Sequence, residues 1–288
     1  MTGLLVVSLA PAVDRYAWLP AMTLGTINRP REVLTQAGGK GLNVARAARG
    51  LDVPARVVVL AGPAFRDLAG DFPARFVDSG TQTRQCLCLL DDAGVLTEIY
   101  EPLLPVPATV WPAVLETVAD EIAQADLVAL SGRVPPGLPI TALASFVELA
   151  NERGVPVIVD AEGPALAAAI AAAPTLIKIN QAEAESVALG TQPAIITAGA
   201  SGARYGPIEV SHDPIEGALP VGSGDAFLAG LAADWLRAGA FHPATALPLA
   251  AAAARANARH LPAGDITWPS VRAELPAITV THPGPVRF

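Results

Sequence analysis

The sequence predicts an α/β fold in which a doubly wound, mostly parallel sheet carries helices on both faces. Apolar segments of strand length alternate with helical segments, which is typical of a parallel sheet with helical connections. The apolar segments are rich in Val, Ile and Leu and show little polar alternation, as in strands covered on both faces. Of the 288 residues 52% are apolar, which is enough for a large core. We therefore treat residues 1–288 as one domain.

The elements follow in order along the chain. Strands of the main sheet are expected at 4–8, 57–61, 127–131, 155–160, 176–180 and 194–198. Helices are expected at 41–49, 112–125, 140–153, 164–173 and 182–189, followed by two long helices at 225–238 and 244–260. Proline and glycine recur after these helices, so the remaining residues are predicted to be irregular.

Two segments, 12–34 and 84–100, do not fit the alternation of helices and strands. The second contains two strand-like runs separated by a short turn and is predicted to be a hairpin. Strands outside the main sheet indicate a small accessory sheet. We expect this sheet to act as a lid, and its free edges could pair with those of a second copy in a homodimer.

Composition excludes several classes of protein. The net charge is −8, which disfavours a nucleic-acid or anionic-membrane partner because both require a basic surface. No apolar segment reaches the roughly 20 residues of a membrane span, and no signal peptide is evident. Cys86 and Cys88 lie two residues apart and do not make a disulfide framework. The expected location is the cytoplasm.

The use of lysine is unusual. Of the 19 basic residues only two are lysines, Lys40 and Lys178. Each falls inside a segment that other signals also indicate, as described next.

A glycine-rich segment, Gly222-Ser223-Gly224-Asp225, precedes a long apolar helix. Glycines allow a close approach of the backbone to a ligand, and the N–H groups at a helix N-terminus stabilise anions. Asp225 at this end could accept a proton from a substrate hydroxyl. The alternative is that Ser223 or Asp225 simply caps the helix.

A second glycine-rich segment comprises Gly38, Gly39, Lys40 and Gly41, with Asn43 shortly after it. Lys40 is followed by glycine and not by Ser or Thr, so this is not a Walker A loop. Backbone N–H groups and the Asn43 amide could contact sugar hydroxyls. An ordinary loop before a helix is the competing interpretation.

Further signals follow strands. Lys178, Asn180 and Glu183 lie at a strand end, where open α/β sheets bind ligands, and Asn180 and Glu183 could hold water around Mg²⁺. Glu183 could equally be an acidic residue of a first helical turn. Weaker signals, when taken singly, are Asp14 after the first strand and the group Thr197, Gly199 and Gly202 after a later one.

Taken together in this order, from Asp14 to Asp225, these segments resemble the ribokinase-like sugar kinases of the phosphofructokinase-B branch. A Ser-Gly-x-x-Pro-Pro-Gly motif that begins at Ser131 belongs to the same pattern. The resemblance runs from about residue 4 to residue 257. It implies a β/α domain with a small β-lid, ATP as phosphoryl donor and Mg²⁺.

The resemblance also implies roles for individual residues. Asp225 matches the catalytic base, and Gly222, Ser223 and Gly224 match the anion hole. The matches to substrate contacts are Asp14, Gly38, Gly39, Lys40, Asn43 and Ser131. The matches to the Mg-ATP region are Lys178, Asn180, Thr197, Gly199, Gly202 and Asn257, with Glu183 toward the metal.

Within the family, the chain most resembles kinases of phosphorylated ketohexoses. The segment that ends at Asp14 is similar to a motif of 1-phosphofructokinase and tagatose-6-phosphate kinase. A pre-existing phosphate requires cations, and Arg84, Arg29 and Lys40 are the candidates. The expected reaction is therefore ATP-dependent phosphorylation of fructose 1-phosphate to fructose 1,6-bisphosphate.

Departures from the family pattern leave alternatives open. Ile179 replaces a usual proline, Arg133 a usual serine, and Leu219-Pro220 a usual polar pair, while the connection 181–193 is short. The alternatives are a kinase of tagatose 6-phosphate, fructose 6-phosphate or an unphosphorylated sugar or nucleoside, and a catalytically silent sugar-phosphate-binding protein.

Overall fold

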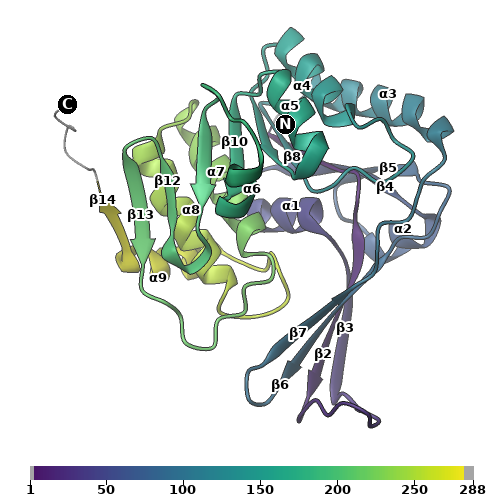
Figure 1. The fold of residues 1–288 in the computed structure, drawn as a ribbon, viewed down its shortest axis with the longest axis vertical. Coiled ribbons are helices and arrows are strands. Elements are labelled where there is room, and N and C mark those ends of the chain that lie inside the picture. The colour runs from purple at the N-terminus through teal and green to yellow at the C-terminus, as the bar shows by residue number, and fades with distance from the viewer. Residues whose placement is uncertain (1–2, 282–288) are drawn as a thin grey trace.

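Two sheets organise the chain. The computed structural model describes residues 3–281, and within this range one sheet has ten strands and the other has four (Figure 1). The large sheet has the order β14-β13-β12-β11-β10-β9-β8-β1-β4-β5. Its strands are β1 (Leu4–Ser8), β4 (Ala55–Ala61), β5 (Ala74–Asp78), β8 (Leu127–Ser131), β9 (Val157–Asp160), β10 (Leu176–Asn180), β11 (Ala194–Thr197), β12 (Ala203–Tyr205), β13 (Ile208–His212) and β14 (Ile278–Thr281).

The strands from β5 to β11 in this order are parallel, whereas β12, β13 and β14 add antiparallel to one edge. The chain builds one half of the sheet from β1 toward β5 and the other half from β8 toward β14. This confirms the doubly wound α/β prediction. The order reverses between β1 and β8, and ligands of open α/β sheets bind beside such a point.

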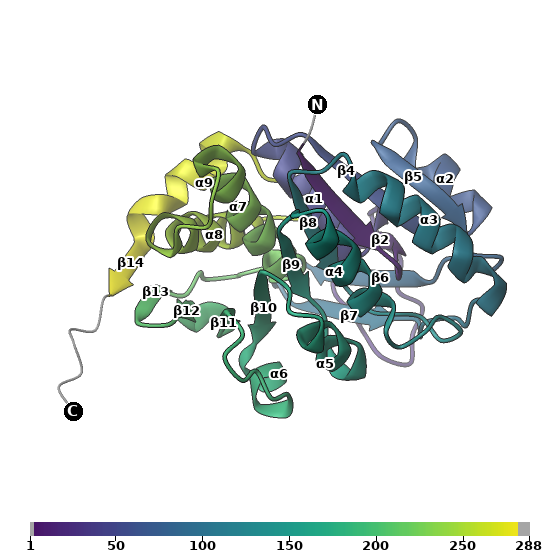
Figure 2. The ribbon, with the colours of Figure 1, turned by 90° about the horizontal axis from the view of Figure 1, so that it is seen from above.

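Helices cover both faces of the large sheet (Figure 2). Leu4 and Val6 of β1 pack with one helical layer, while Leu5 and Val7 pack with the other. The first layer contains α1 (Lys40–Gly50), α7 (Ser223–Ala238) and α8 (Pro243–Asn257), with α2 (Pro63–Ala69) and α9 (Trp268–Glu274) nearby. The second contains α3 (Trp111–Ile122), α4 (Ala142–Glu152), α5 (Gly163–Ala171) and α6 (Gln181–Ser186). None of the helices between residues 3 and 281 is long and apolar enough to cross a bilayer.

The small sheet has the order β3-β2-β6-β7 and projects from the large domain (Figure 1). Its strands are β2 (Ala12–Leu19), β3 (Glu32–Gly38), β6 (Gln85–Asp91) and β7 (Leu96–Tyr100). The predicted lid segment 12–34 ended too early, because β3 continues to Gly38 and leads directly into α1. The expected hairpin is present as β6 and β7. Function as a lid and pairing of two copies through this sheet stay predictions.

Four regions differ from the sequence prediction. The strand β5 and the helix α2 lie in a stretch for which no element was predicted, as do the strands β12 and β13 in a later one, and α9 and β14 lie in the tail that was predicted to be irregular. Each of these is short, and short elements carry too few residues for a periodic signal. The helix after β10 ends at Ser186, three residues before the predicted end.

Among residues 3–281, no helix covers one face of β12 and β13, which lie beyond the short connection after β10 (Figure 2). Arg204, Glu209 and Ser211 alternate with buried residues on these strands and are exposed. Antiparallel strands tolerate one solvated face when that face is polar. The shortened connection is therefore matched by polar side chains in the sheet beside it.

Candidate active site

The carboxyl ends of five parallel strands form one edge of the large sheet. Ser8, Ser131, Asp160, Asn180 and Thr197 each close a strand, on β1, β8, β9, β10 and β11 respectively. Ser131 pairs with Asp160, and Asn180 pairs with Thr197. Polar residues that are far apart in the sequence therefore line one edge.

Asp225 lies in the first turn of α7, next to this edge. The helix starts after Gly222, whose φ of 76° is in the left-handed region that glycine adopts readily. A Cβ on Gly222 would also lie only 2.5 Å from the Cβ of Ala263. Asp225 is buried, and its Oδ2 accepts a hydrogen bond of 3.1 Å from the Asn43 side chain. The turn thus fixes the position of a buried carboxylate.

The side chain of Asn257 holds the turn from behind. Its amide donates to the carbonyl of Val221 at 2.7 Å and to the Ser223 hydroxyl at 3.3 Å. Its oxygen accepts from the Gly264 N–H at 2.8 Å. The residue is 0% exposed and lies under the turn, and the nucleotide contact that the resemblance implied for Asn257 stays a prediction.

Both lysines of the chain converge on one carboxylate that the sequence analysis missed. The Lys178 Nζ lies 2.9 Å from Asp160 Oδ2, and the Lys40 Nζ lies 3.9 Å from Asp160 Oδ1. Asp160 is fully buried, and the two cations keep its pKa below the ordinary value although burial alone would raise it. The signal that could have found it is an acidic residue closing an otherwise apolar strand.

The same charges act on Asp225. Burial, together with the Asp160 carboxylate, raises the pKa of Asp225 from 3.8 to a net value of about 7. Lys40, Lys178 and the hydrogen bond from Asn43 oppose this increase. A carboxyl with a pKa near neutrality can accept a proton and release it again, which is what a general base requires.

The backbone before Asp225 offers donors for an anion. Ser223 N–H donates to the Pro220 carbonyl and Asp225 N–H to the Gly222 carbonyl, each at 3.0 Å. Between residues 3 and 281, the N–H groups of Gly222 and Gly224 have no such acceptor. A Cβ at Gly224 would lie 3.4 Å from the Lys178 Nζ, so the ammonium group stands directly over this turn.

Asp14 faces the start of α1 from the small sheet. Its Oδ2 accepts a hydrogen bond of 3.2 Å from the Gly39 N–H. A Cβ on Gly38 would lie 1.9 Å from the same oxygen, so only glycine permits this approach. Burial raises the pKa of Asp14 to about 6, while the Gly39 N–H, Arg46 and Arg84 oppose the rise. The predicted sugar contacts Asp14, Gly38 and Gly39 therefore meet in space.

Arg46, which the sequence analysis did not single out, orients the side chain of Asn43. Its guanidinium donates to Asn43 Oδ1 at 3.1 Å and to the Ala37 carbonyl at 2.6 Å. Because Asn43 Oδ1 is occupied in this way, its amide nitrogen is directed toward Asp225. Gly41 packs against Ser8, since a Cβ there would lie 2.5 Å from the Ser8 Cβ. The first turn of α1 therefore presses onto the end of β1.

Of the remaining predicted sugar contacts, some lie near Asp14 and one lies far from it. Arg84 is half-buried beside Asp14, and its Nε is buried with no hydrogen-bond partner in the described part of the chain. The buried Ser131 hydroxyl also lacks a partner there. Arg29 is exposed in the loop from β2 to β3, at the end of the small sheet opposite Gly38. Within one chain, the structure does not bring Arg29 to the other candidates.

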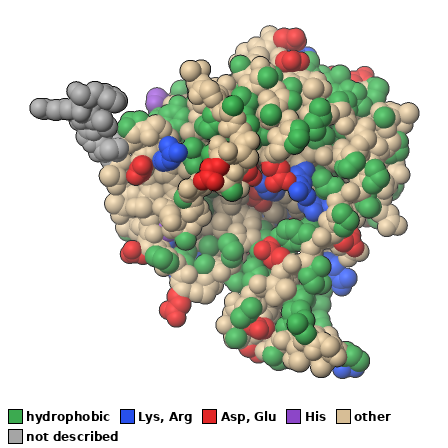
Figure 3. Space-filling view, in the orientation of Figure 1, with side chains coloured by type: hydrophobic (Ala, Val, Ile, Leu, Met, Phe, Trp, Pro, Cys, Tyr) green, Lys and Arg blue, Asp and Glu red, His purple; other side chains and the backbone are tan. Residues whose placement is uncertain are grey.

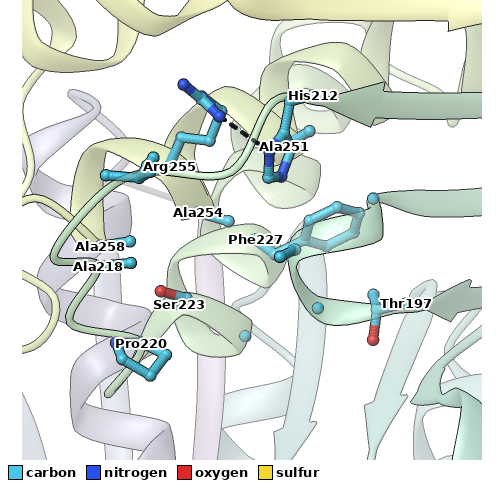
Figure 4. Close-up of a pocket in the computed structure, with 15 residues that line it drawn as sticks. Thr197, His212, Ala218, Pro220, Ser223, Phe227, Ala251, Ala254, Arg255 and Ala258 are labelled. Carbon is cyan, nitrogen blue, oxygen red and sulfur yellow. Dashed lines mark hydrogen bonds between the residues drawn. The ribbon is translucent and has the colours of Figure 1, made fainter.

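A cavity of about 190 Å³ lies on the other side of the Asp225 turn. Thr197, Gly199, Gly202 and Ser223 line it, together with the apolar side chains of Phe227 and several alanines of α8 (Figure 4). The predicted nucleotide contacts on β11 and its following turn thus face the Asp225 helix across one cavity. A mostly apolar wall with a few polar groups is typical of small-ligand sites.

Asn180 and Glu183 form a capping box at the start of α6. The Asn180 oxygen accepts from the Glu183 N–H at 2.9 Å, and Glu183 Oε2 accepts from the Asn180 N–H at 2.8 Å. This confirms the helix-start interpretation of Glu183 without excluding a second role, because only one of its carboxylate oxygens is used. The Glu183 carboxylate adds to the larger effect of Asp160 in raising the pKa of Lys40, so its charge reaches the lysine cluster.

Acidic and basic side chains lie side by side at the hollow between the large domain and the small sheet (Figure 3). The model of the pfkB family of carbohydrate kinases matches residues 1–267. The chain is a pfkB family carbohydrate kinase. The Asp225 turn, the lysine cluster and the cavity beside that turn therefore belong to a chain of this family.

Solved structures agree with this family in fold. A possible 1-phosphofructokinase from Thermotoga maritima superposes with a TM-score of 0.84 at 22% identity, over 97% of this chain and 99% of that chain. Phosphofructokinase-2 from Escherichia coli with fructose-6-phosphate gives 0.82 at 23%, over 96% and 99%. A carbohydrate kinase from Agrobacterium tumefaciens gives 0.73 at 20%, over 98% and 100%. These similarities show the fold of the pfkB kinase, not its sugar.

Proposed function

We propose that this pfkB kinase transfers the γ-phosphoryl group of ATP to the C6 hydroxyl of fructose 1-phosphate, with Asp225 as the general base. One observation carries the proposal. A buried carboxylate with a pKa near 7 lies at a helix N-terminus, between the Asp14 group on one side and the nucleotide-side cavity on the other. A base at the boundary of two subsites is where a hydroxyl would meet a phosphoryl group.

The transfer moves one proton and one phosphoryl group. The hydroxyl proton passes to an oxygen of Asp225 as the hydroxyl oxygen forms its bond to the γ-phosphorus. The bond between the γ-phosphorus and the β–γ bridging oxygen breaks, and ADP leaves with that oxygen. Asp225 then returns the proton to solvent, which its near-neutral pKa permits.

Negative charge on the transferring phosphoryl group would be stabilised by donors that the fold already positions. The free N–H groups of Gly222 and Gly224 in the described chain and the N-terminal dipole of α7 favour negative charge at this turn. Lys178, held by Asp160, adds a positive charge over Gly224. Such preorganised donors supply a large part of the rate in phosphoryl transfer.

The donor set also fits Mg²⁺. This ion typically keeps several waters and uses one or two protein carboxylates together with phosphate oxygens. Glu183 supplies such a carboxylate, because its Oε2 is bonded to the helix start and its second oxygen is not. Mg²⁺ would neutralise charge on the nucleotide phosphates, and Glu183 would hold it through water.

The choice of a phosphorylated sugar rests on Arg84. Its buried Nε has no acceptor among residues 3–281, although its guanidinium donates to the Glu101 carbonyl at 3.3 Å. A buried donor without a partner is costly, and a substrate phosphate next to Asp14 would satisfy it. Lys40, with 46% of its side chain exposed, is the second cation within this region.

Arg84→Ala should therefore raise the KM for fructose 1-phosphate by about 10- to 100-fold, as expected when a charge-assisted hydrogen bond is lost. The KM for ATP should change little. Arg15→Ala is the matched control, because Arg15 is exposed on the neighbouring strand β2 and alternates away from Asp14. Equal sugar KM values for the Arg84 and Arg15 variants would remove the basis for a phosphorylated substrate.

Release of ADP across a sugar panel tests the proposal directly. The panel is fructose 1-phosphate, fructose 6-phosphate, tagatose 6-phosphate, fructose and ribose. Fructose 1-phosphate should give the highest kcat/KM. Preferred turnover of fructose or ribose would assign an unphosphorylated substrate instead. Sugar-phosphate binding without ADP release would indicate a silent binding protein.

A further inference from the structure

Three residues on neighbouring strands of the small sheet form a row that faces the active site. The register pairs Asp14 of β2 with Cys86 of β6, and Cys86 with Tyr100 of β7. Directly paired residues point to the same face of a sheet. Tyr100 is therefore on the same face as Asp14, two strands away.

This face is the inner one. The next pair along the same strands is Tyr16 and Cys88, which pack against Val221 and Ala263 of the large domain. The Tyr16 hydroxyl accepts a hydrogen bond of 3.2 Å from the Ala263 N–H. Since Ala263 lies against the Gly222 turn, the inner face of the small sheet is directed at that turn.

The residues of this row differ in size and exposure. Cys86 is small and buried, whereas Tyr100 is large and 52% exposed. Arg84 directly precedes β6, and its charge acts on both Asp14 and Cys86, so it lies near this end of the row. The charges of Arg84, Asp14, Glu101 and Glu98 all act on the Cys86 thiol, so these groups lie in its neighbourhood. Cys86 is thus the floor of a small basin.

The ring of Tyr100 is held in place at the edge of this basin. Its hydroxyl donates to the Glu98 carboxylate on the same strand and face. Burial and the hydrogen bond to the negatively charged Glu98 raise the pKa of the phenol, which keeps it neutral. A half-exposed aromatic ring with a bonded hydroxyl presents an apolar surface toward the active-site hollow.

We propose that Tyr100 is a specificity-determining residue whose ring packs against the carbon skeleton of the sugar, opposite Asp14. The inference rests on the proposed sugar-phosphate kinase function and adds to it a second recognition surface. Two strand spacings separate Asp14 from Tyr100 by about 10 Å, which accommodates a sugar between a hydroxyl-binding carboxylate and an aromatic ring. The phosphate lies at the Arg84 side of the basin, away from the Glu98 carboxylate.

The test compares Tyr100→Ala and Tyr100→Phe with wild type in ADP-release assays on fructose 1-phosphate. Tyr100→Ala should raise the sugar KM by about tenfold, as expected for a lost aromatic contact. The KM for ATP and kcat at saturating sugar should stay within about twofold. Tyr100→Phe keeps the ring but loses the hydrogen bond to Glu98, and its sugar KM should stay close to that of the wild type. If loss of that hydrogen bond caused the effect of Tyr100→Ala, Tyr100→Phe would raise the sugar KM as well.

Ile99→Ala is the matched control. Ile99 is also 52% exposed and is the neighbour of Tyr100 on β7, but it alternates to the outer face. Size-exclusion chromatography and thermal unfolding of each variant exclude altered assembly or folding as the cause. An unchanged sugar KM in Tyr100→Ala overturns this inference while wild-type turnover leaves the proposed function intact. Failure of the wild-type enzyme to use any sugar phosphate overturns the proposed function itself.

Discussion

Replacing Asp225 with asparagine should make the protein more stable and almost inactive. The carboxyl is buried and its pKa is raised from 3.8 to about 7. The folded state therefore binds a proton at this site more tightly than the unfolded chain does. Between pH 3.8, the pKa in the unfolded chain, and about pH 7, the pKa in the folded state, a rise in pH destabilises the fold, because the unfolded state gives up its proton first.

The size of the effect follows from the shift. A difference of about 3 pKa units corresponds to about 4 kcal/mol at pH values above 7, and to nothing below the unfolded value near 4. An asparagine side chain cannot ionise and so carries no such penalty. Asp225→Asn should thus raise the free energy of unfolding by up to about 4 kcal/mol at pH 8, and by little at pH 4. Loss of the base should lower kcat by about 10²- to 10⁴-fold.

Urea unfolding at pH 4, 6 and 8 measures the first quantity, and ADP release at saturating substrates measures the second. Urea is preferred to guanidinium because it leaves ion pairs unscreened. Asp71→Asn is the control, since Asp71 is exposed in the loop before β5. A gain in stability that does not grow with pH, or a variant with normal kcat, would refute the assignment of a buried base.

Two further perturbations address the charges and the backbone around the base. Asp160→Asn should lower kcat by about tenfold or more, because Lys178 loses the carboxylate that holds it. The acid limb of the kcat/KM profile should move to lower pH, because the Asp160 charge raises the pKa of Asp225. An acid limb that does not move would contradict this coupling. Gly38→Ala should raise the sugar KM and leave the ATP KM unchanged, because the added Cβ would lie 1.9 Å from the Asp14 carboxylate, and equal effects on both KM values would argue against a sugar-side role.

The sequence predicted elements with strong patterns and missed those without them. The buried strands β1, β8 and β10 coincide with the predicted ranges, because a continuous apolar run bounded by turns leaves little choice of where the strand begins and ends. The tail helix α9 was missed. It has only seven residues, and it is stabilised by the tertiary ion pair from Glu274 to Arg255 at 2.9 Å. No local pattern reports a partner that distant in sequence.

The same distinction applies to the site. Glycine-rich segments next to helix starts are visible in a sequence, so the Gly222 turn and the Gly38 segment could be predicted. Asp160 was missed because it acts through lysines from other positions in the fold. Arg46 lies only three residues after its partner Asn43 on α1, so helical spacing could have indicated this pair. Arg29 shows the converse, since its charge suited a phosphate but the length of β2 and β3 carries it away from the site.

The charge cluster would allow a chain with a net charge of −8 to bind the two anionic substrates proposed above. Surface carboxylates more than about 10 Å away are largely screened at ordinary ionic strength, so the local groups decide the potential. Lys178 has only 6% of its side chain exposed and is fixed by Asp160, which reduces the cost of burying its charge. Lys40 is 46% exposed and lies 3.9 Å from the same carboxylate, so a phosphate oxygen can compete for it. One lysine therefore remains a fixed part of the anion site while the other is available to an incoming ligand, and Asp160 determines both.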